Sequence, residues 1–192
     1  MLAIFLDIET SGLNFSKHVP LEIAFRVVDL FSGKEIVSYE RIISCSKETF
    51  DKANADSLKV NGITFADSQK GVKLEVVSKE IVDIFSKNDL IRGKSVFICQ
   101  NPSFDRMFFA KIVDCDIQEN NLWPYHWFDL ASMFFAIHGK QYLKKRNLFS
   151  KDLIASYLNL PKENSPHSAI RGVDHLILCY KTLIGWMDSS LD

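Results

Sequence analysis

The stretch Leu2-Ala3-Ile4-Phe5-Leu6-Asp7-Ile8-Glu9-Thr10-Ser11-Gly12-Leu13 decides the fold and points to a chemistry. Its apolar run predicts a buried strand, and Asp7 and Glu9 lie where that run ends. Because residues two apart on a strand project from one face, both carboxylates are expected on the same side. Two like charges held together need a cation, and carboxylate oxygens suit Mg²⁺ or Mn²⁺. Taken alone, such a pair is more often two solvated acids at a strand end.

Composition narrows the class of protein. The 192 residues, of which 47% are hydrophobic, are typical of one globular domain. The balance of 23 basic against 24 acidic residues excludes a protein that coats nucleic acid through bulk charge, but allows local phosphate contacts. Four cysteines without a CxxC pair indicate reduced thiols. With no basic leader, and with Asp7 interrupting the first apolar run, we expect a cytoplasmic protein without membrane contact.

Hydrophobic periodicity predicts strands first, then alternating strands and helices, then helices. After the first strand, further strands are expected at Leu21–Leu30, Glu35–Ile43, Ser95–Cys99 and Trp127–Asp129. Helices are expected at Val72–Phe85, Pro102–Val113, Leu130–Ile137, Ser150–Tyr157 and Ala169–Trp186, with only short helices in Ser44–Gln69. This order favours a single α/β domain over residues 1–192, with a mixed β-sheet flanked by helices.

Three more residues are candidates to join the acidic pair. Asp105 follows the strand expected at Ser95–Cys99, on the first turn of a helix, where open α/β sheets place their sites. An acid there can also serve simply as a helix cap. Asp174 lies near the start of the last helix, and His167 precedes it on a loop. A single loop histidine is more often an ordinary exposed residue, so each of these signals is weak alone.

Taken in order, these motifs resemble those of the DEDDh-type 3′–5′ exonucleases, a ribonuclease H-like family that includes the proofreading subunit of bacterial DNA polymerase III. The first motif resembles Asp7-Ile8-Glu9-Thr10-Ser11-Gly12-Leu13, and the second Asn101-Pro102-Ser103-Phe104-Asp105. The third is a His followed by Ala and then Asp, as at His167-Ser168-Ala169. Asn61-Gly62-Ile63-Thr64 resembles the family's His-Gly-Ile-Thr loop. The likeness therefore extends over most of the chain.

The chain departs from the family pattern at the fourth acid. The last Asp of the family usually follows the His by five positions, where this chain has Gly172. Asp174 would take its place if the loop between His167 and the helix were two residues longer. The alternative is that the fourth ligand is lost, which would leave a weakened or non-catalytic module that binds nucleic acid or a polymerase.

The resemblance implies hydrolysis of phosphodiester bonds with two divalent cations, Mg²⁺ or Mn²⁺. Asp7 would bridge both ions, and Asp105 would hold one of them. Glu9 and Asp174 would hold the ion that carries the attacking water. His167 would take the proton from that water as general base. All five residues would then be catalytic, and the four acids would be the metal ligands.

The resemblance also implies how the substrate is held. Groups near Glu9 and Thr10 would bind the 3′ hydroxyl, and Leu13 and Phe104 would stack on the terminal nucleotides. Asn101, in the second motif, would be a further substrate contact, while Phe104 could equally be a core residue. The expected substrates are 3′ ends of single-stranded DNA or RNA, trimmed to nucleoside 5′-monophosphates. DNA proofreading is one possible role, with a DNA polymerase as a candidate partner.

Overall fold

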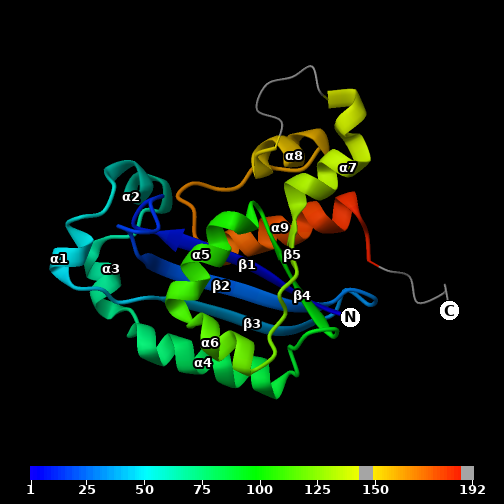
Figure 1. Cartoon of the computed structure of the whole chain (residues 1–192). Coiled ribbons are helices and arrows are strands. Elements are labelled where there is room, and N and C mark those ends of the chain that lie inside the picture. The colour runs from blue at the N-terminus through cyan, green and yellow to red at the C-terminus, as the bar shows by residue number, and fades with distance from the viewer. Residues whose placement is uncertain (143–148, 187–192) are drawn as a thin grey trace.

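A computed structural model describes residues 1–142 and 149–186, and it contains one mixed β-sheet with helices on both faces (Figure 1). Within these residues the sheet has five strands in the order β3-β2-β1-β4-β5. Strands β1 to β3 pair antiparallel, whereas β1, β4 and β5 run parallel. Their bounds are Leu2–Thr10 for β1, Pro20–Asp29 for β2, Glu35–Ile42 for β3, Ser95–Cys99 for β4 and Trp127–Asp129 for β5. The predicted mixed-sheet α/β fold is confirmed.

The expected helices are present, with ends that shift by at most three residues except in α7, which extends five residues beyond the expected Ile137. They are α1 Lys47–Phe50, α2 Ala55–Asn61, α3 Phe65–Lys70, α4 Leu74–Lys87, α5 Pro102–Ile112, α6 Cys115–Asn120, α7 Leu130–Tyr142, α8 Lys151–Tyr157 and α9 Ala169–Leu183. Helix α6 is not among the expected helices, because this short polar helix buries none of its residues and so has no apolar periodicity. None of the helices in the described ranges is long and apolar enough to span a membrane.

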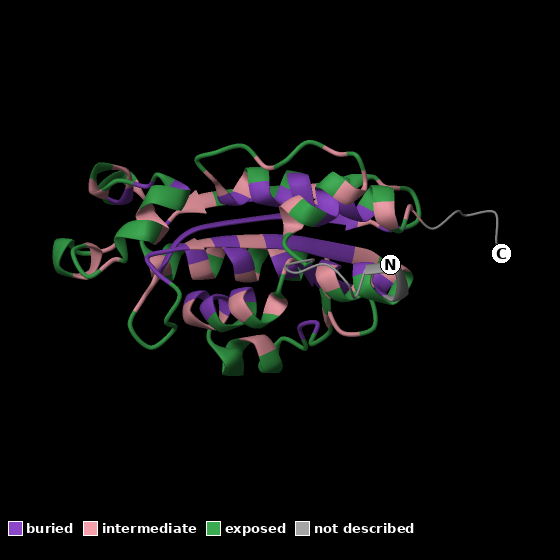
Figure 2. Ribbon diagram, turned by 90° about the horizontal axis from the view of Figure 1, so that it is seen from above, coloured by how far each residue is buried: buried purple, intermediate pink, exposed green. Residues whose placement is uncertain are grey.

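Alternation along β1 divides the core into two layers. Ile4, Leu6 and Ile8 pack in the cluster that includes α4 and α5, whereas Ala3 and Phe5 pack in the cluster that includes α7, α8 and α9. Figure 2 shows the buried residues concentrated on the strands and on the inner sides of the helices. Asp7 and Glu9 continue the line of Ala3 and Phe5, so β1 directs its two acids toward the α9 layer.

The segment between β3 and α4 forms a wall at the carboxyl end of β1, where α1, α2 and α3 gather (Figure 1). The Asn54 N–H donates to the Ser11 carbonyl at 2.8 Å, and Asn61 Nδ2 donates to the Thr10 carbonyl at 3.1 Å. Gly62 ends α2 in the left-handed conformation, with φ of 70°, as the Asn61-Gly62 turn signal predicts. These bonds fix α2 beside the end of the strand that carries Asp7 and Glu9.

Candidate active site

A cavity of about 340 Å³ lies at the carboxyl ends of β1 and β4. Four of the five predicted catalytic residues line it: Asp7, Glu9, Asp105 and His167. They come from β1, from the first turn of α5 and from the loop before α9, so residues far apart in the sequence meet at one place. The rest of the lining is Ile8, Gln100, Asn101, Phe104, Ser150, Lys151, Asp152 and Glu163.

Asp105 lies in the floor of this cavity and is only 3% exposed. Asn101, the N-cap of α5, has a left-handed backbone with φ of 59°, and its N–H donates to Asp129 Oδ1 at 3.0 Å. This bend directs the first turn of α5 toward β1. Burial raises the pKa of Asp105 well above its usual range, and the charge of Asp7 adds to the rise, while a hydrogen bond from the Ile8 backbone opposes it. Asp105 therefore faces Asp7 and belongs to the acidic group.

The pKa values of the two acids of β1 are raised, so their ionised forms are disfavoured without a nearby positive charge. Burial raises the pKa of Asp7 from 3.8 to about 6, although Lys151 and His167 lower it in part. Burial, followed by the charges of Asp7 and Glu22, raises the pKa of Glu9 from 4.5 to about 8. Crowded carboxylates of this kind are stabilised by a cation bound among them.

Asp174 does not join this group, which corrects the prediction that it is the fourth metal ligand. Its side chain is half exposed, and its Oδ1 accepts a hydrogen bond from Arg26 Nε at 2.6 Å. It lines a different cavity, on the outer side of α9. Helix α9 already begins at Ala169, so the loop after His167 is not lengthened and Gly172 keeps the family register. Residues two positions apart in an α-helix point about 200° apart around its axis. Gly172 faces Asp7, and Asp174 therefore faces away from it.

Gly172 lies in direct contact with Asp7. A Cβ built on Gly172 would lie 1.9 Å from Asp7 Oδ2, so no larger residue fits here unless something moves. The fourth acid of the family pattern is therefore absent from the position where α9 touches the acids.

Lys151 and Glu163, which the sequence analysis did not select, bring a buried ion pair to the same place. Lys151 Nζ lies 2.8 Å from Glu163 Oε2, and the two side chains are 12% and 4% exposed. Burial lowers the pKa of Lys151, but Asp7, Glu163 and Glu9 outweigh that effect and the net shift is upward. The charge of Glu163 also raises the pKa values of Asp7 and Glu9, so Glu163 is part of the acidic group. In the sequence, both residues look like ordinary surface charges, and only the gap at Gly172 hinted at a substitute.

A second residue that the pattern did not reveal is Glu22, the cross-strand partner of Glu9. It is 5% exposed and its Oε2 accepts a hydrogen bond from the Ala169 N–H at 2.9 Å, at the start of α9. Burial raises the pKa of Glu22 to about 7, partly offset by this hydrogen bond. Glu22 thereby ties β2 to the helix that carries Gly172. Glu22 could have been found from the sequence only by predicting the register between β1 and β2, which places it opposite Glu9.

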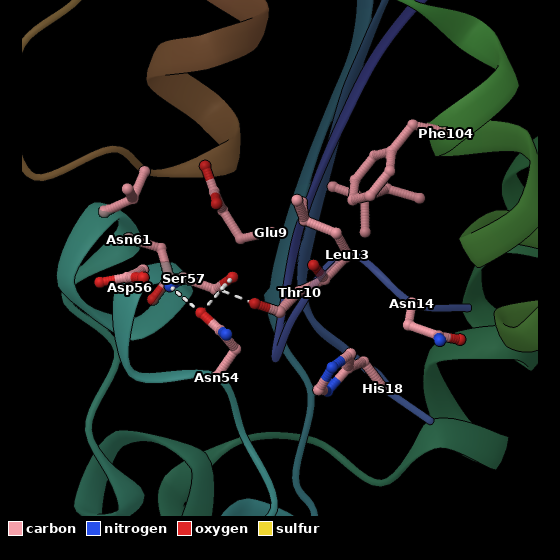
Figure 3. Close-up of a pocket in the computed structure, with 12 residues that line it drawn as sticks. Glu9, Thr10, Leu13, Asn14, His18, Asn54, Asp56, Ser57, Asn61 and Phe104 are labelled. Atoms are coloured by element: carbon pink, nitrogen blue, oxygen red, sulfur yellow. Dashed lines mark hydrogen bonds between the residues drawn. The ribbon is translucent and has the colours of Figure 1, made fainter. Parts of the chain in front are cut away.

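A larger pocket of about 560 Å³ adjoins the acidic cavity and shares Ile8, Glu9 and Phe104 with it. Figure 3 shows Asn61 on one side of Glu9, and Leu13 with Phe104 on the other. Three predicted substrate contacts, Thr10, Leu13 and Phe104, line this pocket, whereas Asn101 lines the acidic cavity.

These substrate candidates differ in how they are held. Leu13 is 77% exposed and free to meet a ligand. The Thr10 side chain is buried and donates to the Gly12 carbonyl at 3.0 Å, so Thr10 offers mainly its backbone. The Phe104 ring lies 4.9 Å from that of Phe108, so it both joins the core and lines the pocket.

The donor chemistry of the cavity fits one divalent ion. Asp7, Glu9 and Asp105 supply the carboxylate oxygens that Mg²⁺ and Mn²⁺ prefer. In residues 1–142 and 149–186, however, no three Asp, Glu, His or Cys side chains are already gathered so as to hold a metal ion. The residues do not fit the predicted second ion, because Asp174 is turned away and Gly172 provides no ligand.

Comparison with known proteins agrees with this architecture. No profile of a protein family matches the chain. Ribonuclease T of Shewanella baltica is 25% identical over 199 residues, which cover 95% of this chain and 84% of that protein. The structure of E. coli exonuclease I with a dT13 oligonucleotide superposes with a TM-score of 0.69 and 17% identity, covering 95% of this chain. The fold is that of a ribonuclease H-like exonuclease.

Another solved exonuclease has the same fold. A 3′-exonuclease whose structure describes 3′-end recognition of a histone mRNA stem-loop superposes with a TM-score of 0.72 and 12% identity, covering 97% of this chain and 83% of its own. The chain spans only 41% of exonuclease I, which has also been solved in a zinc-bound form with single-stranded DNA. The names of these proteins agree with the predicted exonuclease class of hydrolase. They do not point to the polymerase III proofreading subunit in particular.

Proposed function

We propose that residues 1–192 form one metal-dependent 3′–5′ exonuclease domain, which hydrolyses phosphodiester bonds at the 3′ ends of single-stranded DNA or RNA and releases nucleoside 5′-monophosphates. The observation that carries this proposal is the meeting of Asp7, Glu9, Asp105 and His167 on one cavity beside a larger pocket. The names of the relatives support the same activity. Binding to a DNA polymerase is a further hypothesis of the sequence analysis.

The acids of the cavity would hold the metal. A bound Mg²⁺ or Mn²⁺ would neutralise charge that develops on the phosphate and lower the pKa of a water. Asp7 and Glu9 would bind it from β1, and Asp105 from the first turn of α5. Burial, followed by the charge of Asp7, raises the pKa values of Glu9 and Asp105, so a bound cation would favour their ionised forms near neutral pH.

His167 would act as the general base. Its backbone N–H donates to the Val60 carbonyl at 2.9 Å, which anchors the loop before α9 to the end of α2. The half-buried imidazole lines the acidic cavity, and its charge affects Asp7. A proton taken from water by a base placed in this way typically accelerates hydrolysis by about 10²–10⁴.

The adjoining pocket would bind the terminal nucleoside, so that the scissile phosphate reaches the acids. Leu13 and Phe104 would contact the base from one side, while the backbone near Thr10 would meet the sugar. Stacking on an aromatic ring contributes about 1–3 kcal/mol per base and tolerates every base. We therefore expect trimming that depends on a free 3′ end and only weakly on sequence.

One observation favours a second candidate, a weakened or non-catalytic nucleic-acid-binding module. The chain lacks the fourth acid at Gly172, and Asp174 is held by Arg26 instead. A binding module, however, has no need of a histidine beside three acids, which is why we favour the enzyme.

The deciding experiment incubates the full chain with 5′-labelled single-stranded DNA and RNA of matched sequence, in Mn²⁺ or in EDTA. The enzyme predicts a ladder that shortens from the 3′ end and disappears with EDTA. Asp7→Asn should abolish the ladder while preserving the circular dichroism spectrum, and Asp174→Asn is the matched control that should keep it. Binding that persists in EDTA without any cleavage would establish the binding module instead.

A further inference from the structure

Lys151 places a positive charge inside the acidic group, at the point that the missing fourth acid would occupy. The position of a Cβ on Gly172 lies 1.9 Å from Asp7 Oδ2 and 3.3 Å from Lys151 Nζ. Lys151 Nζ also donates to the Gly172 carbonyl at 3.3 Å. The ammonium therefore meets Asp7 where α9 crosses β1.

This ammonium is held firmly. Its bond to Glu163 Oε2 measures 2.8 Å, and both side chains are largely buried. Lys151 is the first residue of α8. The N-cap of this helix, Ser150, accepts a hydrogen bond from the Leu153 N–H. A lysine with this anchoring is a fixed charge and not a solvent-exposed one.

We propose that the Lys151 ammonium takes the place of one of the two divalent cations that the family pattern implies, so that this site binds a single divalent ion. The proposal rests on the exonuclease function and refines it. Glu163 supplies a further carboxylate to the cavity, which has none at Gly172. One of the Glu163 oxygens, however, is already bound to Lys151. A second divalent ion beside the ammonium would add repulsion between cations, and Gly172 offers no carboxylate to offset it.

The remaining oxygens suit one ion. Asp7, Glu9 and Asp105 face the cavity, and Glu163 Oε1 is buried without a hydrogen-bond partner among the residues that the structure describes. A buried carboxylate oxygen without a partner is costly, and a metal ion is one group that could satisfy it. Three carboxylates and this oxygen would thus bind one ion, while Lys151 stays in the second position.

The test is the binding stoichiometry of Mn²⁺, measured by isothermal titration calorimetry on the full chain without nucleic acid. We expect one ion per wild-type chain, with an electron paramagnetic resonance spectrum of an isolated ion and not of a spin-coupled pair. Lys151→Met removes the ammonium and should raise the stoichiometry to two. Lys151→Arg keeps a cation and should bind one ion, as should Lys162→Met, a control that removes an exposed lysine next to Glu163.

Two ions bound to the wild-type chain would overturn the proposal, and so would a single ion in a folded Lys151→Met variant. If Lys151→Met fails to fold, the wild-type stoichiometry and spectrum still decide. Failure of the exonuclease proposal looks different: one Mn²⁺ would bind, but no oligonucleotide would be shortened. Conversely, cleavage with two bound ions would retain the exonuclease and refute the role of Lys151.

Discussion

Replacing Glu9 by Gln should stabilise the metal-free protein at alkaline pH, even though it removes a residue of the site. Glutamine has nearly the same shape as glutamate, but it lacks the negative charge that Glu9 carries beside Asp7 and Glu22. Burial and these neighbours raise the pKa of Glu9 from 4.5 to about 8. At about 1.4 kcal/mol per pKa unit, the ionised carboxylate costs at most about 5 kcal/mol. Because water enters the open cavity and screens the charge, we expect a gain of about 2–3 kcal/mol in the variant.

The direction with pH follows from the raised pKa. The folded protein holds the Glu9 proton more tightly than the unfolded chain, so this contribution to stability is fully present below about pH 4.5. It is lost as the pH rises through about 8, where the folded carboxyl ionises. Glu9→Gln should therefore match the wild type within about 0.5 kcal/mol at low pH and exceed it in stability at about pH 9.

Urea denaturation in EDTA, followed by circular dichroism at several pH values, measures this difference. Glu75→Gln, an exposed change in the first turn of α4, removes a charge outside both cavities and should show no comparable dependence on pH. Adding Mn²⁺ should stabilise the wild type more than Glu9→Gln, because the variant has lost a ligand. The burial argument would be refuted if the difference in free energy of unfolding between Glu9→Gln and the wild type were the same at low and at high pH.

Four other changes test the remaining assignments. His167→Ala should slow single-turnover hydrolysis by about 10²–10⁴ with an unchanged circular dichroism spectrum, and near wild-type rates would exclude it as the base. Asp174→Asn should leave the hydrolysis rate within about twofold and cost at most about 1 kcal/mol in thermal unfolding, since its ion pair with Arg26 is half exposed. Gly172→Ala should lower the free energy of unfolding by about 1–3 kcal/mol, because its methyl group would meet Asp7 Oδ2, and an unchanged denaturation midpoint would contradict this contact. Phe85→Ala should cost about 3–5 kcal/mol in urea denaturation, because this ring is 1% exposed and lies 4.2 Å from Trp123, and a loss below about 1 kcal/mol would be inconsistent with that packing.

Local patterns predicted most of the fold. The strand at Ser95–Cys99 has the predicted bounds, because a short apolar run between turn signals is typical of a buried strand. The strand expected to end at Trp127-Phe128-Asp129 does end there. The three short helices before α4 were also expected from their polar, turn-rich sequence. Helix α6 escaped, since an exposed helix leaves no apolar period for pattern analysis to find.

The sequence by itself determined that Asp7 and Glu9 lie at the end of β1 and Asp105 on the first turn of α5, because the spacing on a strand and the motif around Asp105 are local. Only the tertiary structure decided which charges complete the site. The Ala169 N–H at the start of α9 donates to Glu22 Oε2. In this orientation of α9, Gly172 faces Asp7, and Asp174 pairs with Arg26. The pairing of Lys151 with Glu163 depends on packing of α8 against the loop before α9, and residue spacing contains no signal for such a contact.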